Sequence, residues 1–220
     1  MITVHHLNNS RSQRILWLLE ELGLPYEVKK YQRNKETLLA PEELKKVHPL
    51  GKSPVITDDS VTVAESGAIV EYLLGKYGNG RLRPKAGTPE DLRYTFWIHY
   101  AEGSAMLPPL LTLIFNKIET GPMPFFIKPI AKEISAQVKK VFINPQFKLH
   151  YDYIKDELKK SKWFAGEEFT AADIIMSYPV ETASLRGEVD PRLKEFLASI
   201  HARSAYQRAL ERGGEYQVVL

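Results

Sequence analysis

A glutamate and a serine, Glu65 and Ser66, stand at the head of a helical pattern over Gly67–Tyr77. A serine hydroxyl and the free backbone N–H groups of a helix N-terminus can bind a carboxylate, and a glutamate beside them can bind an ammonium group. The pair therefore suits the α-amino-acid end of a ligand. An ordinary helix cap beside a solvated glutamate is the alternative that this dipeptide alone leaves open.

The residues before this pair predict a loop and a hairpin. Val55–Thr57 and Val61–Val63 are short β-branched runs, and Asp58–Ser60 between them favours a turn, so two antiparallel strands are expected. Pro54 cannot donate a hydrogen bond to a strand ladder, which places it at the first residue of an edge strand. A polar loop and a helix N-terminus are thus expected to face one another.

Further strands and helices precede the hairpin. Ile2–Leu7 predicts a buried strand, and apolar residues at helical spacing from Arg11 predict a helix that Gly23 ends. Tyr26–Tyr31 predicts a second strand, and Pro41–Val47 a short helix with proline at its first position. The order strand, helix, strand, helix, hairpin, helix is typical of a thioredoxin-like domain, here without its usual Cys-x-x-Cys.

The second half of the chain shows only helical patterns after a linker that begins at Gly78–Gly80. Thr88 and Pro89 start a helix, and the prolines at 108 and 109 should kink or end it. Apolar stripes that we assign to packing in a helical bundle follow: Leu92, Phe96 and Tyr100; Ile130, Ile134, Val138 and Val141; Phe147, Tyr151, Ile154 and Leu158.

The strongest local signal of this half lies in Trp163–Ile174, where Thr170 and Asp173 have the spacing of a helix-capping box. Asp190 and Ser204 are expected to cap the last two helices.

Composition limits the chemistry. The 220 residues are 44% hydrophobic and 26% charged, and a net charge of +3 does not argue for nucleic acid. The chain has no cysteine, which excludes disulfides, thiolate metal ligands and a protein thiol nucleophile. We expect no bound metal. We also expect no membrane-spanning helix, because the longest apolar stretch, 106–115, is short and contains two prolines. The start of the chain has no signal-peptide pattern, so a cytoplasmic location is expected.

Two segments carry a resemblance to a known family. GKSPV at Gly51–Val55, followed by ESGAIVEYL at Glu65–Leu73, resembles the glutathione-binding half of cytosolic glutathione transferases, and WFAGEEFTAADI at Trp163–Ile174 is similar to the motif that opens their central C-terminal helix. The resemblance spans Ile2 to about Leu210. It implies an α/β thioredoxin-like domain over residues 1–80 and an all-helical domain over 89–220 that carries the electrophile pocket.

The resemblance also implies a set of glutathione-binding residues. Pro54 would be cis, the backbone of Ser53 would pair with the cysteinyl part of glutathione, and Lys52 would attract the glycyl carboxylate. Glu65 and Ser66 would hold the γ-glutamyl end. Ser53 replaces the usual Val, Ile or Leu before the proline, and we expect its smaller side chain to loosen the loop without abolishing binding.

Members of the family stabilise the thiolate of glutathione with a hydroxyl or an amide near the first strand. Lowering a thiol pKa from about 8.5 by two units takes about 2.7 kcal/mol, which one charge-assisted hydrogen bond and a helix N-terminus could supply. No tyrosine precedes Tyr26, and Ser10 matches the active serine of the serine-type group. Asn8, Asn9 and Ser12 remain rivals, and Ser10 could also be a helix cap. We assign no catalytic role to His5 or His6.

We therefore expect a homodimeric glutathione transferase of the serine-type or fungal and bacterial-like group. Bound glutathione would attack small apolar electrophiles, and reduction of organic hydroperoxides is permitted. Glutathione is the co-substrate, and no further cofactor is expected. The alternative is a non-catalytic regulatory or scaffold module of the same fold.

Overall fold

β1 (Ile2–Leu7) is buried along most of its length because it lies inside a four-stranded sheet. The computed structural model describes residues 1–34, 37, 39–185, 190–214 and 216–218. The strand order is β2-β1-β3-β4. β2 (Tyr26–Tyr31) pairs parallel with β1, whereas β3 (Val55–Asp58) pairs antiparallel with both β1 and β4 (Val61–Ala64). The predicted hairpin is confirmed.

The helices of this half are α1 (Ser12–Leu22), the 3₁₀ turn η1 (Glu42–Lys46) and α2 (Ser66–Tyr77). Gly23 ends α1 in the left-handed conformation, with a φ of 64°. Together with the mixed sheet, these elements form the predicted thioredoxin-like part.

Two local predictions about prolines were wrong. Pro41 flanks η1 in an extended conformation instead of occupying its first position. Pro54 does not begin an edge strand, because β3 lies between β1 and β4. The sheet tolerates this proline because it precedes the first paired residue of β3, Val55, so no ladder hydrogen bond requires its missing N–H group.

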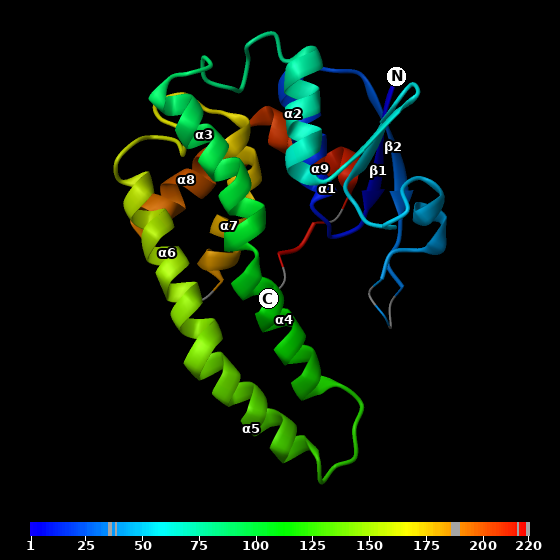
Figure 1. Ribbon diagram of the computed structural model, residues 1–220, viewed down its shortest axis with the longest axis vertical. Coiled ribbons are helices and arrows are strands. Elements are labelled where there is room, and N and C mark those ends of the chain that lie inside the picture. Colours follow the sequence, from blue (N-terminus) through cyan, green and yellow to red (C-terminus); the bar gives the residue numbers. More distant parts are fainter. Residues whose placement is uncertain (35–36, 38, 186–189, 215, 219–220) are drawn as a thin grey trace.

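The rest of the described chain is helical, as predicted (Figure 1). Its elements are α3 (Pro89–Tyr100), the π-helical turn η2 (Ala101–Ala105), α4 (Leu107–Thr120), α5 (Lys128–Val138), the π-helical turn η3 (Lys139–Ile143), α6 (Asn144–Leu158), α7 (Ala171–Ser184), α8 (Pro191–His201) and α9 (Ser204–Gly213). Residues 186–189, 215 and 219–220 of the predicted second domain lie outside the described residues. No helix in the described part of the chain is both long and apolar enough to cross a bilayer.

The helix starts predicted from capping signals are largely confirmed. Thr88 Oγ1 accepts a hydrogen bond from the backbone N–H of Asp91, and Thr170 and Asp173 form a capping box at α7. Ser204 is instead the first residue of α9, and the cap position belongs to Arg203.

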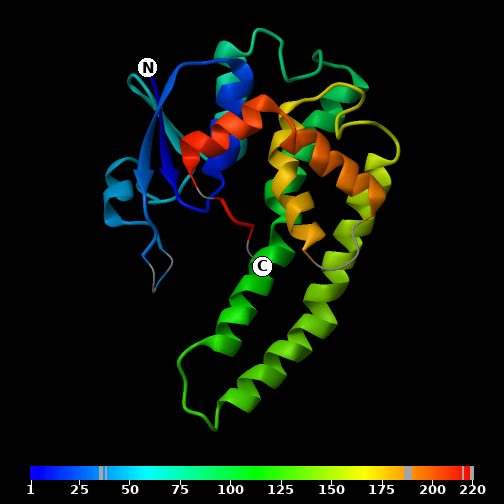
Figure 2. The same cartoon turned by 180° about the vertical axis from the view of Figure 1, so that it is seen from behind.

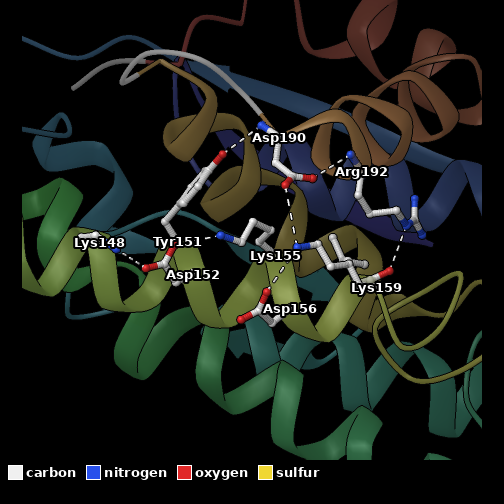
Figure 3. Close-up of polar contacts among 9 residues, drawn as sticks. Lys148, Tyr151, Asp152, Lys155, Asp156, Lys159, Asp190 and Arg192 are labelled. Atoms are coloured by element: carbon white, nitrogen blue, oxygen red, sulfur yellow. Dashed lines mark hydrogen bonds and ion pairs between the residues drawn. The ribbon is translucent and has the colours of Figure 1, made fainter.

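Polar contacts around the N-terminal cap of α8 hold this helix against α6 (Figure 3). Asp190 Oδ1 accepts from the backbone N–H of Arg192 at 2.8 Å, and the N–H of Asp190 donates to the hydroxyl of Tyr151 at 2.9 Å. The Arg192 guanidinium donates to the carbonyl of Leu158 at 2.8 Å. The predicted Asp190 cap therefore also sets the position of α8 on α6.

α4, α5 and the first part of α6 form a long hairpin that projects from the rest of the molecule (Figures 1 and 2). The predicted packing of its stripe was wrong for Ile130, Ile134 and Val141, which are 59%, 56% and 59% exposed. Leu92 and Phe96 of α3 are also exposed. The spacing correctly places these residues on one face, but within the described chain little packs against those faces. The stripe of α6, by contrast, is buried or half-buried.

The two halves share one hydrophobic core, in which α1 lies beside α9 and α7 (Figure 2). The ring of Trp17 packs on Phe169 and Tyr206, with centroids 5.8 and 5.0 Å away. The buried Arg14 donates to the carbonyl of Ile175 at 2.7 Å. α1 is thereby held by side chains from both halves of the chain.

Candidate functional site

The turn that leaves β1 presents Ser10 beside the loop that enters β3. Ser10 Oγ lies 2.7 Å from Ser12 Oγ and 3.3 Å from Ser53 Oγ. α1 begins at Ser12, with Arg11 at its cap position, and Ser10 Oγ accepts from the backbone N–H of Ser12 at 3.3 Å. The half-buried Ser10 hydroxyl thus makes a capping-type contact one residue before the cap, and it is also a candidate for chemistry.

The rivals of Ser10 already have partners. Asn8 Oδ1 accepts from the backbone N–H of Arg33 at 2.8 Å. Asn9 has a φ of 48°, and its Oδ1 accepts from the backbone N–H of Gln217 in the C-terminal tail at 3.1 Å. Ser12 Oγ is buried against His6 at 2.8 Å. These contacts occupy the acceptor atoms of both amides. Ser10 Oγ also has partners, Ser12 and Ser53, but its contact with Ser53 places it next to the loop that enters β3.

Ser53 and Pro54 are joined by a cis peptide bond, as the resemblance implies. Ser53 is buried, and its Oγ donates to the carbonyl of His5 at 2.9 Å and accepts from the N–H of Leu7 at 3.4 Å. The expected loosening of the loop is therefore not what the structure shows, because a hydroxyl at this position ties the loop to β1 by hydrogen bonds that an aliphatic side chain could not make.

A shallow pocket opens over this loop and brings together four of the predicted site residues. It also includes four residues that the sequence did not single out, Arg11, His48, Leu50 and Ala64, whereas Ser10 and Ser66 are not part of its lining. The full lining is Arg11, His48, Leu50, Lys52, Ser53, Pro54, Ala64 and Glu65. Lys52 and Glu65 supply opposite charges to the same pocket, which is what a ligand with separate carboxylate and ammonium ends requires.

Glu65 and Ser66 stand where α2 begins, and both are unusual. Glu65 has a φ of 73°, in the left-handed region that non-glycine residues rarely adopt. Ser66 is 2% exposed, and its Oγ has no well-aligned hydrogen-bond partner among the described residues. Buried hydroxyls normally have a partner, so this group is available to a ligand.

A carboxylate from the helical half lies behind Ser66. Glu102, in the π-helical turn η2, accepts from Arg11 at 2.5 Å and pairs with the buried Arg14 at 3.1 Å. Burial acts to raise the pKa of Glu102, but Arg14, Arg11 and the nearby Ser66 hydroxyl outweigh it and hold the pKa below its usual value. Sequence reasoning missed Glu102 because no local motif marks it.

The arrangement can hold an extended zwitterionic molecule across the loop, with its middle beside Ser53 and Ser10. In the described part of the chain, no group of three or more His, Asp or Glu side chains could hold a metal ion. The chemistry that these residues can supply is hydrogen bonding and charge stabilisation.

Comparisons with known proteins identify the family of the chain. Residues 1–75 match the family model described as the glutathione S-transferase N-terminal domain. The chain is 37% identical to glutathione S-transferase 3 of Schizosaccharomyces pombe over 96% of this chain and 88% of that protein. The chain belongs to the glutathione S-transferase family.

Solved structures of glutathione S-transferases share the fold over nearly the whole chain. A glutathione S-transferase from Actinobacillus pleuropneumoniae superposes with a TM-score of 0.78 at 34% identity, covering 97% of this chain and 93% of that one. A sphingomonad glutathione S-transferase, solved in complex with glutathione, superposes with a TM-score of 0.72 at 21% identity, covering 96% and 98%. The thioredoxin-like and helical parts of this chain are thus those of a glutathione S-transferase.

Proposed function

We propose that this glutathione transferase binds glutathione across the pocket over the β3 loop and activates its thiol with Ser10. Glu65 and Ser66 hold the γ-glutamyl end, the backbone of Ser53 before the cis Pro54 pairs with the cysteinyl part, and Lys52 attracts the glycyl carboxylate. The sphingomonad relative in complex with glutathione supports glutathione as the ligand.

The main observation in support of the role of Ser10 is its short distance from the loop that enters β3. Its Oγ lies 3.3 Å from Ser53 Oγ, and Ser53 is the residue whose backbone would pair with the cysteinyl unit. A sulfur bound there is a near neighbour of the Ser10 hydroxyl. Asn8 supports the assignment indirectly, since its acceptor atom is already bonded to the backbone of Arg33.

The γ-glutamyl end has support from five side chains in one place. The buried Ser66 hydroxyl lies beside Glu102 without a well-aligned partner and can turn to a ligand carboxylate, Arg14 and Arg11 supply positive charge, and Glu102 and Glu65 can attract an ammonium. The backbone conformation of Glu65 is costly for a non-glycine residue, and such conformations concentrate at ligand sites.

Residues 1–80 would hold glutathione, and the helical domain over 89–220 would carry the pocket for a small apolar electrophile. α7 packs against α1, the helix that follows Ser10, and the Arg14 guanidinium of α1 lies 5.7 Å from the ring centroid of Tyr178. Attack on a hydroperoxide oxygen would need no further group. A homodimer in the cytoplasm completes the proposal, with glutathione as co-substrate and no added cofactor.

The deciding experiment is the thiolate absorbance of bound glutathione against pH, in the wild type, Ser10→Ala and Asn8→Ala. If Ser10 donates the hydrogen bond that accounts for most of a two-unit shift, Ser10→Ala raises the pKa of the bound thiol and slows conjugation of 1-chloro-2,4-dinitrobenzene about tenfold or more at neutral pH. A shift lost in Asn8→Ala and kept in Ser10→Ala would transfer the role to the amide. Binding without turnover of any electrophile would favour the non-catalytic module.

A further inference from the structure

The long hairpin formed by α4 and α5 ends in exposed apolar side chains, at the point farthest from the rest of the molecule (Figures 1 and 2). In this hairpin tip, residues 121–130, Phe125 is 84% exposed and Phe126 is 63% exposed. Their rings contact each other edge to face, with centroids 5.6 Å apart. Ile127 and Ile130 are exposed as well and continue the apolar surface into α5. A contiguous exposed apolar patch, unlike scattered single residues, marks a site of interaction.

A tight turn presents the two phenylalanines. The backbone N–H of Ile127 donates to the carbonyl of Pro124 at 3.0 Å, so Phe125 and Phe126 occupy the two central positions of a β-turn. Prolines at positions 122, 124 and 129 fix the φ angle at three places in the hairpin tip. Because its backbone is already restricted, the tip loses little conformational freedom when the rings enter a partner.

Lysines flank this apolar end on both helices. The segment 117–140 contains five lysines and two glutamates, so its formal charge of +3 equals that of the whole chain. Three of these lysines are exposed and form no ion pair with an acidic side chain in the described part of the chain: Lys117, Lys128 and Lys132. Of the two glutamates, Glu119 is bound by Lys139 at 2.6 Å. The charge of the hairpin therefore attracts an anionic partner.

The size and shape of the hairpin tip favour a lipid surface over a second protein. A phenylalanine side chain has about 150–250 Å² of surface, so Phe125 and Phe126 expose roughly 220–370 Å² together. A stable protein interface buries about 800 Å² on each partner and needs a complementary surface, which the projecting end of a hairpin does not offer. A bilayer is apolar inside and anionic at its cytoplasmic surface, which matches an apolar end with lysines beside it.

We propose that the hairpin tip docks this protein on the surface of a membrane that carries anionic lipids. The two phenylalanines enter the boundary between headgroups and acyl chains, and Lys117, Lys128 and Lys132 meet the anionic headgroups. The contact is peripheral and needs no spanning helix. No residue of the tip lines the pocket over the β3 loop, so that pocket stays open. If glutathione binds there as proposed, it meets apolar electrophiles where they concentrate, beside a bilayer; the docking itself does not depend on that function.

The test measures flotation of the full chain with vesicles of phosphatidylcholine, either alone or with about 30% phosphatidylserine as the anionic lipid. One variant combines Phe125→Ser with Phe126→Ser, and a second combines Lys128→Glu with Lys132→Glu. Leu92→Ser is the matched control, because Leu92 is also strongly exposed but lies on α3, in the body of the molecule. Thermal melts of each variant verify that it is folded.

We expect the wild type to bind the vesicles with phosphatidylserine, and to bind about tenfold more weakly without that lipid or at high salt, which screens the lysines. The double phenylalanine variant should lose about tenfold or more of its binding, because the transfer of each ring out of water is lost. The double lysine variant should lose its preference for phosphatidylserine. Leu92→Ser should bind like the wild type.

A Phe126→Trp variant reports on the tip directly. The native tryptophans, Trp17, Trp97 and Trp163, are buried, so added fluorescence that responds to lipid comes from the new indole. With vesicles that contain phosphatidylserine and brominated phosphatidylcholine, the emission of this indole should shift to shorter wavelength and be quenched. Without vesicles it should have the emission of an indole in water.

Three outcomes would overturn the proposal. The first is a wild type that does not float with the vesicles containing phosphatidylserine, or a double phenylalanine variant that floats as well as the wild type. The second is an equal loss in Leu92→Ser, which would show unspecific adsorption of exposed apolar residues. The third is an indole in Phe126→Trp that is shielded from water without vesicles, together with dissociation of the double phenylalanine variant in sedimentation equilibrium, which would assign the tip to a second copy of the chain.

Discussion

Ser66 is the residue on which the γ-glutamyl assignment can be tested most directly, because its buried hydroxyl lacks a well-aligned protein partner. Ser66→Ala should remove a hydrogen bond to the glutathione carboxylate and weaken binding by about 1.5–3 kcal/mol. Titration calorimetry measures this loss. Ser60→Ala, in the exposed turn of the same hairpin, is the control and should bind like the wild type. Unchanged affinity in Ser66→Ala would remove Ser66 from the site.

Asp58 shows what sequence reasoning could not see at this scale. The sequence identified it as a turn residue, yet its carboxylate is 2% exposed and accepts from Lys76 at 2.7 Å, Tyr77 at 2.5 Å and Tyr72 at 2.8 Å. All three donors lie on α2. A turn preference is local, whereas these partners meet Asp58 only after α2 has packed on the sheet.

Those donors make Asp58 a pH-dependent source of stability. The hydrogen bonds from Lys76, Tyr77 and Tyr72 lower its pKa to about 2, below the value in the unfolded chain. Its contribution is therefore present above about pH 4 and lost as the pH falls through 2. Asp58→Asn should lower the free energy of unfolding by about 1–2 kcal/mol at pH 7, a figure reduced for the solvent exposure of Lys76. Urea unfolding of both proteins at pH 7 and pH 3 should show the difference shrinking at low pH; an equal difference at both would contradict the assignment.

At the scale of elements, α7 depends on Asp173 more than an ordinary helix depends on its cap. The Asp173 carboxylate is buried and accepts from the backbone N–H groups of Phe164 and Thr170, each at 2.8 Å. Asp173→Ala would leave both donors without a partner. We expect a loss of about 2–4 kcal/mol, against about 0.5–2 kcal/mol for Thr88→Ala at the exposed cap of α3.

Chemical denaturation of the Asp173→Ala and Thr88→Ala variants gives the comparison. Equal losses in the free energy of unfolding of the two variants would mean that Asp173 contributes no more than an ordinary helix cap. The folded fraction of Asp173→Ala should bind glutathione normally, because Asp173 lies away from the pocket lining.

The elements themselves were predictable to different degrees, for a physical reason. Helix starts at Thr88 and Thr170 were found because a cap depends on residues three positions apart. The spacing of the apolar residues in α5 correctly predicts one apolar face. That spacing carries no information about which element, if any, packs against the face. For the same reason the sequence pointed to Glu65 and Ser66 through a local motif and to Ser10 through the family resemblance. It missed Glu102, which lies beside Ser66 only through the packing of η2.

For the whole molecule, the shared core predicts that the two halves unfold together. Trp17 of α1 packs against Phe169 and Tyr206, and Arg203 of the helical half binds Glu21 of α1 at 2.5 Å. α1 therefore loses packing on both sides if either half opens. Urea unfolding followed by tryptophan fluorescence and by far-ultraviolet circular dichroism should give one coincident transition.

Two separated transitions would instead mean that residues 1–80 fold independently. A chain cut after residue 80 serves as the control, because it exposes the surface of α1 that Tyr206 and Phe169 cover. We expect that fragment to be unfolded or strongly destabilised.

The placement of the C-terminal tail decides at which end of the chain a purification tag should be fused. The hydroxyl of Tyr216 donates to Glu181 at 2.9 Å and the N–H of Gln217 to Asn9 at 3.1 Å, so the tail crosses beside the turn that holds Ser10. The amino group of Met1, by contrast, lies 2.7 Å from the exposed Asp59 and 3.9 Å from Asp58 at the end of β3. If Ser10 activates the thiol as proposed, a purification tag fused after this tail should lower kcat in the wild type, whereas a tag fused at the N-terminus should leave kcat unchanged.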